Sequence, residues 1–168
     1  MKLTSNEKKL LVNLLEDSML NDAQLARKMR LSPQGVGKIR KRLEEKGVIE
    51  EYRLRLNYER IGIAVFAIAM LEFTPKGIAT LAAGGLEKML DSNMIDVFHT
   101  PSGIAPLIIL FGFRNLGEHD YYFRRFKEEN IDTFVVKQVF TFSNAGIVRR
   151  TSTELYMKVL KEMGKIIP

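Results

Sequence analysis

The chain has 168 residues, of which 46% are hydrophobic, and it carries a formal net charge of +6 with no cysteine. This length accommodates one domain or two small ones with packed cores, and the lack of cysteine excludes disulfides and thiolate metal ligands. The longest apolar run, residues 61–71, is shorter than a membrane span, and no secretory signal opens the sequence. We therefore expect a cytoplasmic protein without a membrane partner.

The positive charge is concentrated at the front of the chain. Residues 1–60 carry 14 Lys/Arg against 9 Asp/Glu, whereas residues 61–168 carry 12 against 11. A basic N-terminal part followed by a near-neutral remainder is typical of a protein whose first domain binds a polyanion.

Capping patterns predict the first two helices. Thr4 and Glu7 form a capping box ahead of a leucine-rich stretch, and Asn21 with Gln24 forms a second one ahead of a short helix over residues 22–29. The first helix is expected to pack across the second and the third.

A turn at Arg30-Leu31 leads to the third helix. Ser32 supplies the cap and Pro33 occupies the first helical position, where proline is well tolerated. One stripe of this helix is apolar and is expected to be buried: Val36, Ile39 and Leu43.

The remaining faces of the third helix are basic. Between Ala23 and Leu43 the chain has seven basic residues and no acidic one, and a short helix that supports a basic one is the arrangement that enters the major groove of DNA. Glutamine suits adenine, lysine suits guanine and glycine allows close approach to bases, whereas other cations contact phosphates. The predicted base-facing residues are Gln34, Gly35 and Lys38, with Ser32 just ahead of them, and the predicted phosphate contacts are Arg27, Lys28, Arg40, Lys41 and Arg42.

Residues 48–56 alternate imperfectly between apolar and charged side chains, which predicts a two-stranded wing. Arg53 and Arg55 lie two positions apart, on one face of such a strand, and are expected to reach phosphate. Residues 1–57 are thus predicted to form a winged helix-turn-helix domain, and residues 58–62 a linker.

Several stretches of this domain carry a resemblance to a known family: Gln24-Leu25-Ala26-Arg27, Leu31-Ser32-Pro33, Val36, Arg42-Leu43-Glu44 and Gly47-Val48-Ile49. They are similar to the N-terminal domain of the leucine-responsive (Lrp/AsnC, feast/famine) transcription regulators. The chain departs from that family at Ile39-Arg40, where the family usually places a basic residue before an aliphatic one. The resemblance implies a regulator that binds double-stranded DNA as a homodimer or higher homo-oligomer, its two recognition helices about one helical turn apart.

Beyond residue 62 strands and helices alternate. Apolar runs predict strands over residues 63–73, 94–100, 106–113 and 134–142, and helices are expected from Pro75 and over residues 117–129. The order βαββαβ is that of a ferredoxin-like domain, expected over residues 63–150, and is also the order that the resemblance implies for the effector and oligomerisation domain. The fold class is therefore α+β.

Two apolar surfaces follow from this layout. Helices on one face of the sheet leave the other uncovered, and we expect residues such as Val65, Ile68 and Ile109 to lie there and mediate dimerisation. A C-terminal helix over residues 151–168, begun by a capping box at Thr151 and Glu154, is expected to pack on the domain or on a second subunit. Its apolar stripe comprises Leu155, Val159, Met163 and Ile166.

The turn after the second strand is the candidate effector site. In the resembled family small effectors, commonly amino acids, bind between paired domains near a glycine-aspartate turn. Here no acidic residue follows the glycine to hold an ammonium group, so a simple amino acid is not the expected effector. The turn is either a plain hairpin or part of a pocket for a less charged ligand, with candidate residues Thr100, Ser102, Gly103, Ile104 and Ala105.

No catalytic, cofactor or metal site is expected. The two histidines, His99 and His119, lie on different elements, and no phosphate-binding glycine loop or nucleophile-base pattern is present. Two alternatives to an effector-responsive regulator remain open. One is a DNA-architectural or co-regulator protein without an effector, which the altered turn favours. The other is an enzyme similar to the haem-pathway decarboxylases, against which the absence of a histidine cluster counts.

Overall fold

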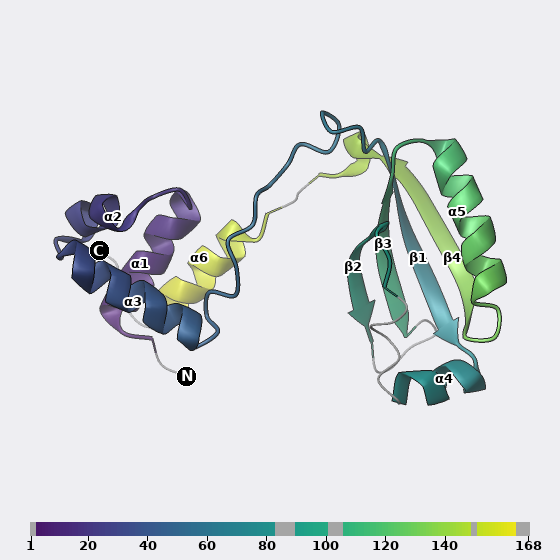
Figure 1. Ribbon diagram of the computed structural model, residues 1–168, viewed down its shortest axis with the longest axis horizontal. Helices are drawn as coiled ribbons and strands as arrows, with labels where there is room; N and C mark the ends of the chain where they lie inside the picture. The colour runs from purple at the N-terminus through teal and green to yellow at the C-terminus, as the bar shows by residue number, and fades with distance from the viewer. Residues whose placement is uncertain (1–2, 83–89, 101–105, 149–150, 164–168) are drawn as a thin grey trace. The chain divides into compact units, whose positions relative to one another are not determined.

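The computed structural model describes residues 3–82, 90–100, 106–148 and 151–163 (Figure 1). The chain folds as two compact units, one made of Met1–Arg55 with Arg149–Pro168 and the other of Leu56–Val148. Both ends of the chain therefore contribute to the first unit.

Three helices open the first unit, and local capping explains where each begins. Helix α1 (Ser5–Glu16) starts with the predicted Thr4–Glu7 capping box, and α2 (Asp22–Met29) starts with the predicted box at Asn21. Helix α3 (Pro33–Glu45) begins after Ser32, whose hydroxyl accepts from the Gly35 amide. The turn between α2 and α3 contains Arg30 in the left-handed region, with φ of 55°, which ends α2.

A leucine-rich core joins these helices. Val36 and Leu43 of α3 are fully buried and Ile39 packs beside them, as the stripe predicted. The other buried apolar residues come from all the helices of the unit and from the N-terminal segment: Leu3, Leu10, Leu14, Leu25, Ala26 and Leu160.

The C-terminal helix α6 (Thr153–Glu162) belongs to this unit and packs on α1. Its start and its buried face differ from the prediction. The helix follows Ser152 without a side-chain cap, because the Thr151 hydroxyl bonds to Thr153 instead. Leu160 makes the buried contact. The predicted stripe is exposed at Leu155, Val159 and Met163, and Ile166 lies outside the described residues.

The wing predicted over residues 48–56 does not form as strands. Val48 and Ile49 pack against the helical core, whereas residues 50–57 have no regular secondary structure and are exposed. The alternation was imperfect, and no second strand lies beside this segment in the described ranges to supply ladder hydrogen bonds.

The second unit is an antiparallel sheet with the predicted βαββαβ order. Its strands are β1 (Val65–Phe73), β2 (Met94–His99), β3 (Leu107–Phe113) and β4 (Phe134–Ser143), arranged β2-β3-β1-β4. Helix α4 (Pro75–Ala82) follows β1 and helix α5 (Leu116–Glu129) follows β3. A short 3₁₀ turn, η2 (Asn144–Gly146), ends β4.

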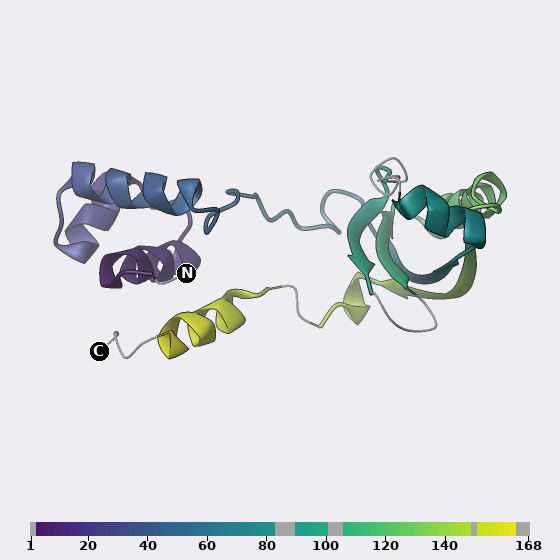
Figure 2. The same cartoon turned by 90° about the horizontal axis from the view of Figure 1, so that it is seen from below.

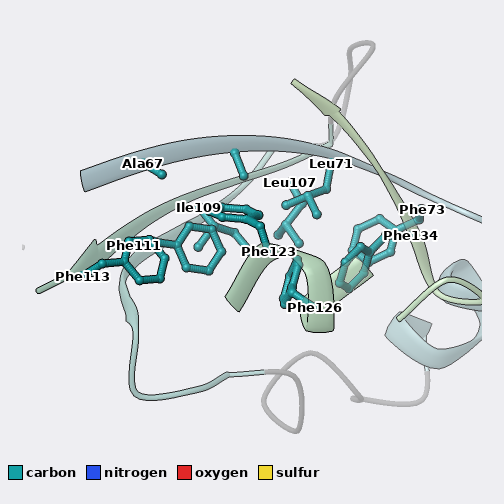
Figure 3. Close-up of a cluster of buried hydrophobic side chains, with 11 residues drawn as sticks. Ala67, Leu71, Phe73, Leu107, Ile109, Phe111, Phe113, Phe123, Phe126 and Phe134 are labelled. Carbon is teal, nitrogen blue, oxygen red and sulfur yellow. The ribbon is translucent and has the colours of Figure 1, made fainter. Parts of the chain in front are cut away.

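Both helices lie on the same side of the curved sheet (Figure 2). Alternate residues of β1 and β3 point toward them and form an aromatic core with Phe123 and Phe126 of α5 (Figure 3). Val65 and Ile109 face this core, so their predicted place on the uncovered face is wrong. The strand period of two residues puts Ile68 on the opposite face, as expected.

Candidate DNA-binding surface

The third helix of the helix-turn-helix exposes polar side chains near its start. Gln34 and Lys38, four residues apart on α3, are exposed on one face of the helix. Gly35 stands between them close to the cap, since a Cβ there would lie 3.1 Å from Ser32 Oγ. At Gly35 no side chain extends from the first turn of α3, so the backbone there can approach a surface closely.

Four cations on the helices α2 and α3 have no ion pair with any described residue. Arg27 and Lys28 lie in the last turn of α2, and Lys38 and Arg42 lie on α3; all four are exposed. Lys41 is also exposed and has only a loose pair with Glu45, at 3.9 Å. Unpaired surface cations raise the local positive potential, so this surface attracts a polyanion.

Arg40 differs from its neighbours. Its side chain is only 19% exposed, and Nε donates to Asp22 Oδ1 at 2.9 Å. Nη1 donates to the Tyr52 hydroxyl at 3.0 Å and Nη2 to the Leu20 carbonyl at 3.1 Å. Burial would lower the pKa of Arg40, but the hydrogen bonds with Tyr52 and Asp22 raise it overall. Sequence reasoning missed these partners because they lie in two segments, residues 20–22 and Tyr52, that are distant from Arg40 along the chain.

The arginines expected on the wing lie in the irregular segment. Arg53 and Arg55 are exposed, and Arg53 is ion-paired with Glu51. Without a strand, their side chains are not held on one common face.

The predicted effector turn lies almost wholly outside the described residues. Ser102, Gly103, Ile104 and Ala105 belong to that part, whereas the Thr100 amide donates to the Pro106 carbonyl at 2.7 Å. Strands β2 and β3, on either side of these residues, pair antiparallel.

A cleft of about 510 Å³ between α5 and β4 was not anticipated. Phe123 and Val139 are apolar residues that line it, and Arg124 and Lys127 are cations that line it. His119 also lines it, with Nδ1 2.8 Å from Asp120 Oδ1 and Nε2 3.1 Å from Thr141 Oγ1. Residues so far apart in sequence carry no local signal of such a cleft.

Within the described ranges no three His, Asp or Glu side chains group as metal ligands would. None of the helices there is long and apolar enough to cross a bilayer.

Comparison with known proteins identifies the helix-turn-helix. A family model for winged helix-turn-helix DNA-binding domains matches residues 3–50. An uncharacterised HTH-type transcriptional regulator of Pyrococcus furiosus is 25% identical over 170 residues, covering 100% of both chains. The HTH-type transcriptional regulator LrpA of Pyrococcus horikoshii is 29% identical over 97 residues, which cover 58% of this chain and 66% of LrpA.

The fold of the whole chain agrees with that relationship. The crystal structure of an AsnC family transcriptional regulator from Agrobacterium tumefaciens superposes with a TM-score of 0.73 at 19% identity, covering 89% of this chain and 95% of the other. The chain thus resembles Lrp/AsnC transcription regulators, in sequence through LrpA and in fold through the AsnC family structure. Its N-terminal domain matches helix-turn-helix DNA-binding domains, and the relatives named above are transcriptional regulators rather than enzymes.

Proposed function

We propose that this protein is a sequence-specific DNA-binding regulator of the Lrp/AsnC type that acts in the cytoplasm as a dimer. The observation that carries the proposal is the exposed, largely unpaired basic surface of α2 and α3 beside a first turn of α3 that holds Gln34 and Gly35. In this assignment Ser32, Gln34, Gly35 and Lys38 face bases, while Arg27, Lys28, Lys41 and Arg42 contact phosphates. Arg53 and Arg55 remain proposed phosphate contacts from the segment that follows.

Salt dependence of DNA binding tests the phosphate contacts. Replacing Lys41 and Arg42 together by alanine removes two cations that release counterions on binding. Because the proposed dimer carries this pair twice, the slope of log K against log salt is expected to become shallower by about 4, with weaker binding to all DNA sequences. Fluorescence anisotropy over a salt series measures both quantities.

The matched control is Lys158→Ala with Lys161→Ala, which removes two exposed cations from α6. Helix α6 packs on α1, and its cations are not part of the proposed surface. The control should leave the slope unchanged. If the Lys41 and Arg42 variant kept the wild-type slope, the assignment would be wrong.

Footprinting separates this function from the DNA-architectural alternative. A regulator protects discrete sites, whereas an architectural protein protects extended stretches of DNA with little sequence preference.

The dimer in this proposal forms through the uncovered face of the sheet. On that face Ile68 of β1 is paired with Phe140 of β4. Phe98 of β2 is paired with Ile108 of β3 on the same face. Phe98 and Phe140 are exposed large apolar residues, and such a patch on a sheet is a common protein interface.

We extend the proposal to a small-molecule effector, for which the cleft between α5 and β4 is a suitable place. An apolar floor with convergent polar groups and a volume of about 510 Å³ is typical of a small-molecule site. Isothermal titration calorimetry with amino acids and their uncharged analogues tests this part; the absence of any binding would leave the effector-free alternative.

A further inference from the structure

Arg40 joins three separate segments of the helical unit. Each of the three guanidinium nitrogen atoms donates a hydrogen bond to a different partner. The partners are Asp22 at the start of α2, the Leu20 carbonyl in the preceding loop, and the hydroxyl of Tyr52. The planar fork of arginine suits such multiple contacts, and lysine cannot reproduce them. The charge of Arg40 is balanced by the Asp22 carboxylate and is therefore not free like that of Arg42.

Tyr52 is held on α3 at two positions one turn apart. Its ring lies 5.6 Å from the Arg40 guanidinium carbon, within the range of a cation–π contact. Its hydroxyl accepts from Arg40 and donates to Glu44 Oε1 at 3.0 Å. Residues 50–57 have no regular secondary structure, so these contacts fix one point of an otherwise irregular segment.

The start of α2 also lies close to α3. A Cβ on Gly37 would lie 3.1 Å from Asp22 Oδ2, which means that glycine leaves room for the carboxylate beside the helix. Gly37 thereby allows Asp22 to reach Arg40, one turn further along α3.

From these contacts we infer that Arg40 is a positioning residue and not a DNA contact. It sets the orientation of α3 against α2 and fastens the segment at Tyr52 to α3, so that the base-facing residues of α3 are presented correctly. This inference rests on the proposed function and corrects the expectation that Arg40 contacts phosphate.

A phosphate contact and a positioning residue predict different affinities and salt slopes for Arg40→Lys and Arg40→Ala. A phosphate contact keeps most of its affinity when the residue is lysine, and with alanine it loses about one unit of salt slope for each protomer of the dimer. A positioning residue loses specific affinity in both variants, by at least tenfold, while the salt slope stays that of the wild type. The ratio of specific to non-specific affinity should fall as well, because non-specific binding depends on the free cations.

Arg42→Ala is the matched control, since Arg42 is two positions away, exposed and unpaired among the described residues. It should lose about one unit of salt slope for each protomer of the dimer. A shallower slope for Arg40→Ala, together with wild-type affinity for Arg40→Lys, would overturn the inference.

Tyr52→Phe keeps the ring and removes only the hydroxyl, and because Tyr52 is exposed the variant is expected to fold. It should lower specific affinity about threefold without changing the slope. A double-mutant cycle of Arg40→Lys and Tyr52→Phe, followed by urea unfolding without DNA, measures the coupling directly. We expect at least a threefold coupling in the unfolding constant; additive effects would disprove the clamp. If the wild-type protein bound no DNA, the proposed function would fail, and the cycle would still decide whether Arg40 and Tyr52 are coupled.

Discussion

Glu7 is a buried carboxylate whose partners connect the start of α1 with the end of α3. Its side chain is fully buried, with Oε1 2.6 Å from Lys46 Nζ at the end of α3 and Oε2 accepting from the Thr4 amide at 2.7 Å. The hydrogen bond from Lys46, aided by that from Thr4, holds the pKa of Glu7 at about 2, below its ordinary 4.5. The capping-box pattern predicted the contact with Thr4, but nothing local predicted Lys46, which is 39 residues away.

The lowered pKa makes stability depend on pH. Glu7 binds protons less readily in the folded protein than in the unfolded chain, so its contribution is fully present above pH 4.5 and is lost as the pH falls through about 2. We expect Glu7→Gln to lower the free energy of unfolding by about 2 kcal/mol at pH 7, the usual worth of a hydrogen bond to a charged group. This difference should shrink as the pH approaches 2.

Urea unfolding of wild type and variant across pH 2.5–7 measures that difference. Glu45→Gln is the control, because Glu45 is exposed and its pair with Lys41 is loose; its effect should stay within about 0.5 kcal/mol. A Glu7→Gln difference that is constant with pH would contradict the assignment.

The helices and strands themselves were largely predictable. Capping patterns located the starts of α1, α2 and α3, and runs of apolar residues located all four strands to within a few residues. The predictions of the wing and of the cap of α6 were wrong. Residues 48–56 were too irregular to pair, and Thr151 bonded to Thr153 and did not cap α6.

Helix α6 is held to the helical core by contacts near its C-terminal end. Leu160 is 7% exposed in the helical core, and the buried Lys8 ammonium donates to the Met163 carbonyl at the end of α6, at 2.7 Å. Leu160→Ala should lower the free energy of unfolding by about 3 kcal/mol through the cavity that it leaves. Leu155→Ala, at a position that is 59% exposed, should change it by less than about 0.5 kcal/mol.

Urea unfolding followed by circular dichroism compares the two variants. Equal effects would mean that α6 does not dock on α1 through Leu160.

At the scale of the whole molecule, the sheet unit leaves one face without helices. The register of β1 with β4 sets Ile68 opposite Phe140 on that face. Phe140 is 48% exposed, although burying a phenylalanine side chain stabilises a protein by about 2 kcal/mol. A second copy would remove this apolar surface from water.

Phe140→Arg should therefore convert the proposed dimer to a monomer, because a charged side chain at an apolar interface is costly to desolvate. Thr141→Arg is the control: it is the next residue of the same strand and points to the helix-covered side of the sheet, where it is exposed. Light scattering gives the mass of each variant. A wild-type protein that is already monomeric, or a Phe140→Arg variant that stays dimeric, would refute this interface.

The sequence by itself determined the features that depend on neighbours within about one helical turn or along one strand. These are the caps, the apolar stripe of α3, the basic composition of the helix-turn-helix and the order of strands and helices. Its resemblance to the Lrp/AsnC regulators also pointed to the family.

Tertiary structure alone decided which side chains meet across the fold. It brought Lys46 into contact with Glu7, Lys8 with the end of α6, and Asp22 and Tyr52 with Arg40. It also decided which face of β1 and β3 lies under the helices. These contacts join residues far apart in the sequence, and their geometry is fixed only when the cores pack, so no local pattern of residue types could reveal them.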